Sequence, residues 1–364
     1  MLVPFNNINY KLMFKILIAA ILLLTAFDAV SQVRRLTIVD AENKEPINNV
    51  RLLSENGNIL NTSDSKGIIF LKLKSPQEKN ATMVETSHFL YTRYKENLEQ
   101  IPDTIKLIPK ANLLEEVIVT KKKNGTRYYK LIAYFRTWRM VNNKLQNYVE
   151  GTKEVHVPYD HSNSNKEYFT QYVSYKDSLY HKNYIDISFG GDGFLYTKIY
   201  PNDYFTRHKK LYNLVQSSEN YYDLMEGGAK VGYVKYDDTH QISEVNKKDI
   251  AEDVKLLGHT INYRDYSYER WNNSGNRHLS MSRNTIKKEI KGANSTHAIE
   301  TVTEIYIEDE EFERLEKPTK YKNAVNPDRS FYEKAFYKNY RVKYPLQKEI
   351  EIQLNTIQQN ENTY

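Results

Sequence analysis

The stretch His297-Ala298-Ile299-Glu300 has the spacing closest to a metal-binding motif in this sequence. A catalytic zinc site needs two close ligands and a distant histidine, and it leaves one coordination position open for water. The residues around this stretch alternate as in a strand, where positions three apart point to opposite faces. We therefore expect a half-buried strand histidine at His297 and no zinc site.

Other polar groups could be assembled into a triad or a cation site. With 9 His and 46 acidic residues, such groupings arise by chance, so they carry no assignment. An acidic run could supply the converging oxygens that calcium requires, but a charged, solvated strand end is the preferred interpretation. These groups are Asp238, His240 and Glu244; His156, Asp160 and His161; and the run Glu308-Asp309-Glu310-Glu311.

The sequence lacks the motifs of the common enzyme classes. It contains no Gly-x-Ser-x-Gly, Walker-type loop or Gly-x-Gly-x-x-Gly. The Gly-rich stretch from Phe189 to Phe194 has no helical pattern after it, so we interpret it as a loop between strands. The absence of cysteine excludes disulfides, thiolate metal sites and a cysteine nucleophile. We predict no catalytic, cofactor-binding or metal-binding residues and no enzymatic activity.

Composition indicates a globular protein of two domains that is rich in sheet. The chain has 364 residues, enough for two cores. Its 31 tyrosines favour half-buried sheets, where the ring packs and the hydroxyl stays wet. The net charge of +6 is spread over the chain without a dense basic arm, so nucleic-acid binding is not expected.

The first 31 residues have the pattern of a secretory signal peptide. Lys11 and Lys15 precede the apolar run 16–24, and Ala29-Val30-Ser31 offers small residues for cleavage after Ser31. An N-terminal anchor helix is the alternative, but the apolar run is short for a membrane span. We expect an exported protein, periplasmic or associated with the outer membrane, with no transmembrane span after cleavage.

Residues 32–120 have the short strands and close turns of a seven-stranded antiparallel β-sandwich. The polar turn from Asp64 to Gly67 lies between two strands, and we expect a positive φ angle at Gly67. Glu55-Asn56-Gly57-Asn58 carries an Asn-Gly hairpin signal.

An ordered set of motifs in this segment resembles the carboxypeptidase regulatory-like domain. That resemblance implies a transthyretin-like β-sandwich, found as an N-terminal extension of outer-membrane and secreted proteins of Gram-negative bacteria. It implies no reaction, because the domain has no catalytic residues to carry over. The matching residues are Leu36 to Asp40, Glu45-Pro46-Ile47 with Val50, Thr62-Ser63-Asp64 with Gly67 and Phe70, and Leu114 to Thr120.

A basic linker at 121–126 precedes a larger β-rich domain at 127–364. Its opening reads as a hairpin from Leu131 to Val157 around Asn142-Asn143-Lys144, with an amphipathic helix over Tyr128 to Met140 as the alternative. Few helices are expected, at Asn246 to Leu256 and over Phe331 to Tyr337. Strands are predicted at 168–175, 184–189, 193–199, 229–236, 259–271, 278–291 and 298–307.

The predicted fold is therefore mainly β, with an N-terminal seven-stranded β-sandwich and a larger C-terminal antiparallel β-sheet or half-barrel. The hairpin ending at Pro158 is faintly similar to the LolA-like lipoprotein-carrier fold, and the whole chain resembles secreted proteins with a Tyr-rich β domain of uncharacterised role. We expect an exported cell-envelope binding or assembly protein, with another envelope protein or an apolar or glycan ligand as partner. A periplasmic carrier or sensor of a lipid or apolar ligand is the alternative, and an envelope hydrolase ranks last.

Overall fold

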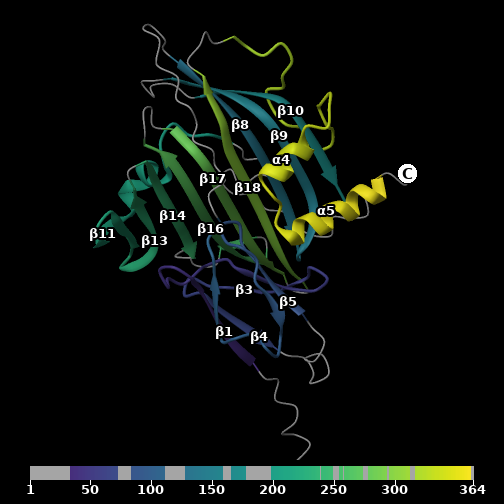
Figure 1. Ribbon diagram of the computed structural model, residues 1–364. Coiled ribbons are helices and arrows are strands. Elements are labelled where there is room, and N and C mark those ends of the chain that lie inside the picture. Colours follow the sequence, from purple (N-terminus) through teal and green to yellow (C-terminus); the bar gives the residue numbers. More distant parts are fainter. Residues whose placement is uncertain are drawn as a thin grey trace, which may run out of the picture. The chain divides into compact units, whose positions relative to one another are not determined.

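The computed structural model divides the chain into two compact units, residues 1–110 and 111–364 (Figure 1). The predicted signal peptide, the motif 114–120 and the linker 121–126 lie outside the described residues, and they stay predictions. The structure describes residues 33–72, 83–110, 128–158, 165–177, 198–237, 239–248, 254–256, 258–273, 278–292, 295–311 and 316–361.

The first unit contains the two sheets of the predicted sandwich. One sheet has the order β4-β1-β7 and the other has the order β3-β2-β5-β6, and buried residues of both sheets share one apolar cluster. One pair differs from the antiparallel prediction, because β1 and β7 run parallel. The strands are β1 (Val33–Asp40), β2 (Arg51–Ser54), β3 (Ile59–Thr62), β4 (Ile68–Lys72), β5 (Met83–Ser87), β6 (Lys95–Asn97) and β7 (Thr104–Leu107).

The turn before β4 carries the chain from one sheet to the other. The Asp64 carboxylate accepts hydrogen bonds from the backbone N–H groups of Lys66 and Ile68, both at 2.9 Å. Gly67 has a φ angle of +69°, as predicted. A Cβ atom at Gly67 would lie 2.4 Å from the carbonyl oxygen of Ile38, so the position excludes any side chain.

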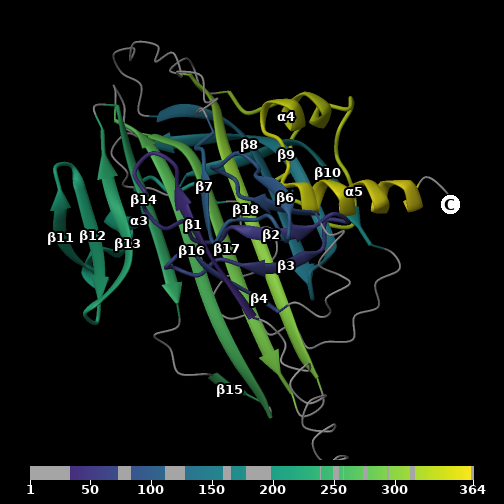
Figure 2. The ribbon, with the colours of Figure 1, turned by 60° about the horizontal axis from the view of Figure 1, so that its bottom comes forward.

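The second unit is built on one 11-stranded antiparallel sheet. Its order is β10-β9-β8-β18-β17-β16-β14-β13-β12-β11, and β15 pairs with β16 off this path. Figure 2 shows β11, β12 and β13 side by side at one end of the sheet. The strands are β8 (Tyr128–Val141), β9 (Lys144–Pro158), β10 (Lys166–Lys176), β11 (Asn213–Ser218), β12 (Tyr221–Glu226), β13 (Ala229–Tyr236), β14 (His240–Lys248), β15 (Val254–Leu256), β16 (His259–Asn272), β17 (His278–Lys291) and β18 (Thr296–Glu311).

The mainly β class is thus confirmed, and so is the opening hairpin of this unit. β8 and β9 pair from Tyr128 opposite Pro158 to Val141 opposite Lys144, which excludes the helical alternative. Asn142 and Asn143 turn the chain with φ angles of 50° and 64°. Asparagine tolerates this left-handed conformation better than most residues.

Two helix predictions were wrong. The described part of 246–256 lies in β14 and β15, because Asn246 pairs with Tyr266 of β16 and Val254 pairs with Ile261. The stretch from Phe331 forms no helix before Tyr337, because the backbone N–H and C=O of Phe331 bond to Tyr172 of β10. The predicted strand 184–189, the loop 189–194 and most of the strand 193–199 lie outside the described residues.

Three α-helices are described in the second unit, α3 (Tyr204–His208), α4 (Tyr337–Lys343) and α5 (Lys348–Glu361), and a short 3-10 helix, η1 (Lys209–Leu211), follows α3. α4 and α5 lie over one face of the sheet near β8, β9 and β10 (Figure 1), and Ile350 and Leu354 of α5 are buried there. α3 and the residues before it border the cleft described below. None of the described helices combines the length and hydrophobicity that a membrane crossing requires.

Candidate ligand-binding cleft

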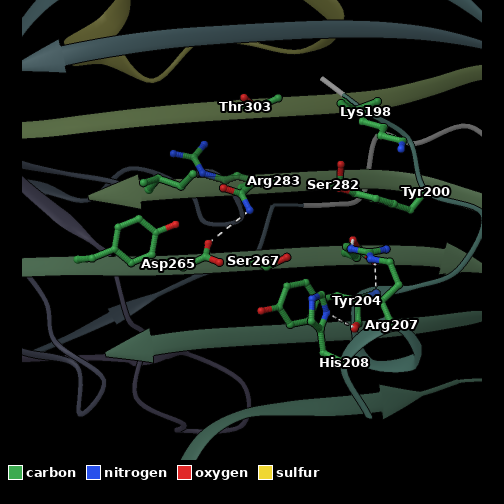
Figure 3. A pocket seen from close by; sticks show the side chains of 15 residues that line it. Lys198, Tyr200, Tyr204, Arg207, His208, Asp265, Ser267, Ser282, Arg283 and Thr303 are labelled. Atoms are coloured by element: carbon green, nitrogen blue, oxygen red, sulfur yellow. Dashed lines mark hydrogen bonds and ion pairs between the residues drawn. The ribbon is translucent and has the colours of Figure 1, made fainter. Parts of the chain in front are cut away.

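A cleft of about 330 Å³ lies over β16, β17 and β18 and is bounded by the segment 198–208 (Figure 3). We call the strand residues that line it the floor and the segment 198–208 the wall. Strand side chains alternate between faces, so most of the floor comes from every second residue of each strand. The floor residues are Tyr263, Asp265, Ser267 and Glu269 of β16, Ser282, Arg283, Asn284 and Ile286 of β17, and Thr303 and Ile305 of β18.

The strand register places short polar side chains in a row across the floor. Ser267 lies opposite Asn284, and Asn284 lies opposite Thr303. The Asn284 amide donates to the Asp265 carboxylate at 3.4 Å. Thr303 Oγ1 lies 3.1 Å from Thr137 Oγ1 of β8. The row therefore offers hydroxyl, amide and carboxylate groups from neighbouring strands.

Glu269 connects the wall to the floor through hydrogen bonds. Its carboxylate accepts hydrogen bonds from the Tyr204 backbone N–H at 2.6 Å, from Arg207 Nη2 at 2.8 Å and from Trp271 Nε1 at 2.8 Å. Asp203 caps α3 by accepting from the Thr206 N–H at 2.9 Å. With three donors around it, the buried Glu269 has a positioning role.

The preceding residues of the wall are held by a second ion pair. Lys153 Nζ donates to one oxygen of Glu167 at 2.9 Å, and the other oxygen accepts from the Ile199 N–H at 3.0 Å. Burial lowers the pKa of Lys153, and Glu167 opposes that effect. This pair fixes the backbone between Lys198 and Tyr200.

The wall itself presents an aromatic ring and cations. The Arg207 guanidinium lies 4.1 Å from the Tyr200 ring centroid, and Lys198 Nζ lies 5.3 Å from the same centroid. Burial raises the pKa of Tyr200, so its hydroxyl stays protonated at neutral pH. Figure 3 shows Tyr200 and Arg207 at one end of the cleft and Asp265 toward the other.

The same face of the sheet is packed solidly beside the cleft. Phe135, Val155, Phe169 and Leu279 belong to one apolar cluster and are buried. The rings of Phe135 and Phe169 meet edge to face, with centroids 5.4 Å apart. Apolar side chains of the protein therefore fill this part of the face.

The structure separates His297 and Glu300, the pair with the spacing of a zinc motif. His297 lies opposite Ile290 and Glu300 lies opposite Lys287, so residues three apart on β18 point to opposite faces. His297 is half-buried, as predicted, with Nδ1 3.5 Å from the Asn142 amide nitrogen. The part of the chain that the structure describes holds no group of three metal-ligating side chains.

The described members of the other groups have partners outside their group. His240 lies beside Asp237, whereas Glu244 accepts a hydrogen bond from the Tyr233 hydroxyl at 2.9 Å. His156 lies 3.8 Å from Glu154. Asp160, His161 and Asp238 lie outside the described residues.

The acidic run on β18 divides between partners instead of converging. Lys343 donates to Glu308 at 2.9 Å, and Lys130 pairs with Glu311 at 2.6 Å. Glu310 is buried, contrary to the expected solvated strand end, and lies 3.3 Å from Nδ1 of the buried His278. Burial, with a smaller contribution from Asp309, raises the pKa of Glu310 to about 7.

Sequence reasoning did not find the cleft. The available signal was a strand in which small polar or acidic residues alternate with tyrosines, from Asp265 to Glu269. The wall, by contrast, is positioned by contacts between residues far apart in the chain, such as Glu269 with Arg207. Comparison with family models and with curated proteins finds no match to this chain.

Proposed function

We propose that this chain is an exported cell-envelope binding protein without catalytic activity, and that the cleft of its second unit binds a glycan. The observation that carries the proposal is the polar row Ser267, Asn284 and Thr303 with Asp265 beside it. Binding sites combine a few convergent polar groups with aromatic surface in a concave region.

The chemistry of the cleft suits a sugar. Carboxylate, amide and hydroxyl groups can accept from and donate to the many hydroxyls of a saccharide. An aromatic body with a polar tip, such as Tyr200, offers a packing surface for the apolar side of a sugar ring. A cleft of about 330 Å³ is at the lower end of the usual range for small-ligand sites, which suits one or two sugar rings.

The two floor carboxylates are poorly placed for glycoside hydrolysis. A glycosidase needs two carboxyl groups about 5 to 10 Å apart that are both available to the sugar. Asp265 accepts a hydrogen bond from the Asn284 amide of the floor at 3.4 Å. Glu269 is also engaged by Arg207, Tyr204 and Trp271. These features support binding without cleavage.

A carrier of lipid or another apolar ligand has less support. That alternative requires an apolar cavity of several hundred cubic ångströms. Most side chains of the cleft floor are polar, with Ile286 and Ile305 among them, and the adjoining apolar surface is occupied by Phe135, Phe169 and their neighbours. Copurified lipid after gentle extraction would favour the carrier over the glycan-binding protein.

Two experiments test the proposal. Fractionation of the native host checks export, which rests on the leader 1–31; recovery from the cytoplasm would contradict it. Calorimetric titration with a peptidoglycan disaccharide and with a lipopolysaccharide core oligosaccharide checks binding. We expect saturable binding of one of them, lost in Asn284→Ala and retained in Asn355→Ala on the exposed side of α5. Equal affinities of the two variants would contradict the assigned cleft.

A further inference from the structure

One edge of the large sheet is covered by another segment of the described chain, and the other edge is exposed. At the β10 edge, Phe169 exchanges backbone hydrogen bonds of 2.9 and 2.8 Å with Lys322, and Tyr172 exchanges bonds of 2.6 and 2.7 Å with Phe331. The chain after β18 therefore covers that edge. β11 forms the opposite edge, and within the described ranges it pairs only with β12.

β11 lacks the features that usually protect an edge strand. All six residues of Asn213–Ser218 are exposed, and none carries a charge. Leu214 and Val215 point to opposite faces and are 44% and 51% exposed. Soluble proteins commonly place lysine, proline or a covering segment on such an edge, because unpaired backbone groups attract another strand. A bulge between Gln216 and Ser218 interrupts only its end.

We propose that β11 pairs in antiparallel orientation with β11 of a second copy of this chain. The residues that flank the strand identify the occupant. Lys209 and Lys210 precede it, Glu219 follows it, and all three are exposed. Antiparallel pairing about a twofold axis brings the beginning of each β11 beside the end of the other. The two lysines of one copy then approach Glu219 of the second copy at both ends.

The strand between these charges is also self-complementary. Its uncharged side chains impose no repulsion between identical copies, in contrast to an edge strand that carries lysine. Strand addition supplies main-chain hydrogen bonds, and side chains on alternate positions supply packing. Leu214 of both copies lies on one face of the joined sheets and Val215 of both copies lies on the other.

The oligomeric state tests the proposal directly. We expect sedimentation velocity of the purified chain to show a monomer–dimer equilibrium. Val215→Lys should shift it to monomer, because the added charges repel at the centre of the pairing. Val342→Lys is the matched control, since Val342 is 80% exposed on α4, and it should dimerise like the unmodified chain. A wild-type monomer at all concentrations, or Val215→Lys that dimerises as wild type does, would overturn the proposal.

A charge exchange tests the orientation and the identity of the partner. Lys209→Glu with Lys210→Glu should weaken the dimer at least tenfold, and so should Glu219→Lys. All three changes in one chain restore opposite charges at both ends, so dimerisation should recover. Circular dichroism shows whether each variant is folded. Folded variants in which the triple change stays as weak as the others would exclude antiparallel self-pairing.

Discussion

Arg136 of β8 and Glu304 of β18 lie directly opposite each other and form an ion pair in which both side chains are almost completely buried. On its other side, Glu304 pairs with Arg283 of β17. Arg136 in turn lies opposite Glu150 of β9, so the row of charged residues extends to a fourth strand. Acidic and basic side chains thus alternate across four adjacent strands, from Arg283 to Glu150.

The C-terminal residues complete this row. The Tyr344 carbonyl accepts from Arg136 Nη1 at 2.7 Å, and Gln347 accepts from Arg283 Nη2 at 2.8 Å. Arg341 of α4 donates to Glu150 at 2.9 Å. Because buried charges are costly without partners, these contacts specify where α4 and α5 pack.

The first prediction concerns Glu304. Glu304→Gln should lower the free energy of unfolding by about 3–5 kcal/mol, because Arg136 and Arg283 would remain buried with a neutral partner. Urea unfolding measures the loss. The control is Glu333→Gln, which removes an exposed ion pair with Lys320 and should leave the midpoint urea concentration of unfolding unchanged. Similar midpoints for both variants would contradict the buried row.

The second prediction concerns Gly67. Gly67→Val should destabilise the first unit by roughly 1–2 kcal/mol or more, because the residue would need a positive φ angle and its Cβ would overlap the Ile38 carbonyl. Lys66→Ala, in the same turn but exposed, is the control. Thermal unfolding should separate the two variants, and an unshifted transition in Gly67→Val would mean that the turn is assigned wrongly.

The third prediction is a pH dependence that originates at Glu310. Its folded pKa of about 7 lies above the ordinary value of 4.5, so the folded state binds this proton more tightly. Its contribution is complete below about pH 4.5 and is lost as the pH rises through 7. Glu310→Gln should therefore be more stable than wild type by about 3 kcal/mol at pH 8 and by less than about 1 kcal/mol at pH 5.

Unfolding at the two pH values provides the measurement. Glu311→Gln on the same strand is the control, because its partner Lys130 lies at a partly exposed position. In this control, the free energy of unfolding should differ between pH 5 and pH 8 by the same amount as in the wild type. If the free energy of unfolding of Glu310→Gln also changed between pH 5 and pH 8 as in the wild type, the raised pKa of Glu310 would be refuted.

The fourth prediction concerns the wall of the cleft. Glu269→Gln weakens charge-assisted hydrogen bonds to Arg207 and to the Tyr204 backbone, each worth about 1.5–3 kcal/mol. Amide exchange in 198–208 should become faster, while exchange in the first unit is unchanged. Ser282→Ala alters the same floor at a residue that forms no described hydrogen bond to the wall, and it serves as the comparison. Unchanged protection of 198–208 in Glu269→Gln would argue against its positioning role.

Local patterns predicted the strands well but not the features that depend on tertiary contacts. Alternation located β13 and β17 from Ala229 and His278 onward, and the turn at Gly67 followed from polar residues beside a glycine. The helix over 246–256 failed because pairing with β16 overrode local helical preference. α5 was missed although Ile350 and Leu354 are spaced as on one helical face.

The tyrosine content has a structural explanation that composition alone did not supply. Half-burial was expected, but several hydroxyls bond to carboxylates inside the second unit. Tyr134 donates to Glu150 at 2.7 Å, and Tyr306 donates to Glu304 at 3.0 Å. Burial raises the pKa of Tyr134 and Tyr306, so both remain donors at neutral pH. Partners separated by many residues in sequence, such as Arg136 and Glu304, leave no local pattern from which to predict them.

The central claim is that the cleft binds a glycan and leaves it intact. Its most direct test is to incubate the protein with a peptidoglycan disaccharide or a lipopolysaccharide core oligosaccharide and to isolate the complex. Mass spectrometry then measures the mass of the released ligand. We predict stoichiometric recovery of one unmodified ligand from wild type and none from Asn284→Ala. Recovery of a cleaved ligand, or of neither ligand from wild type, would contradict the claim.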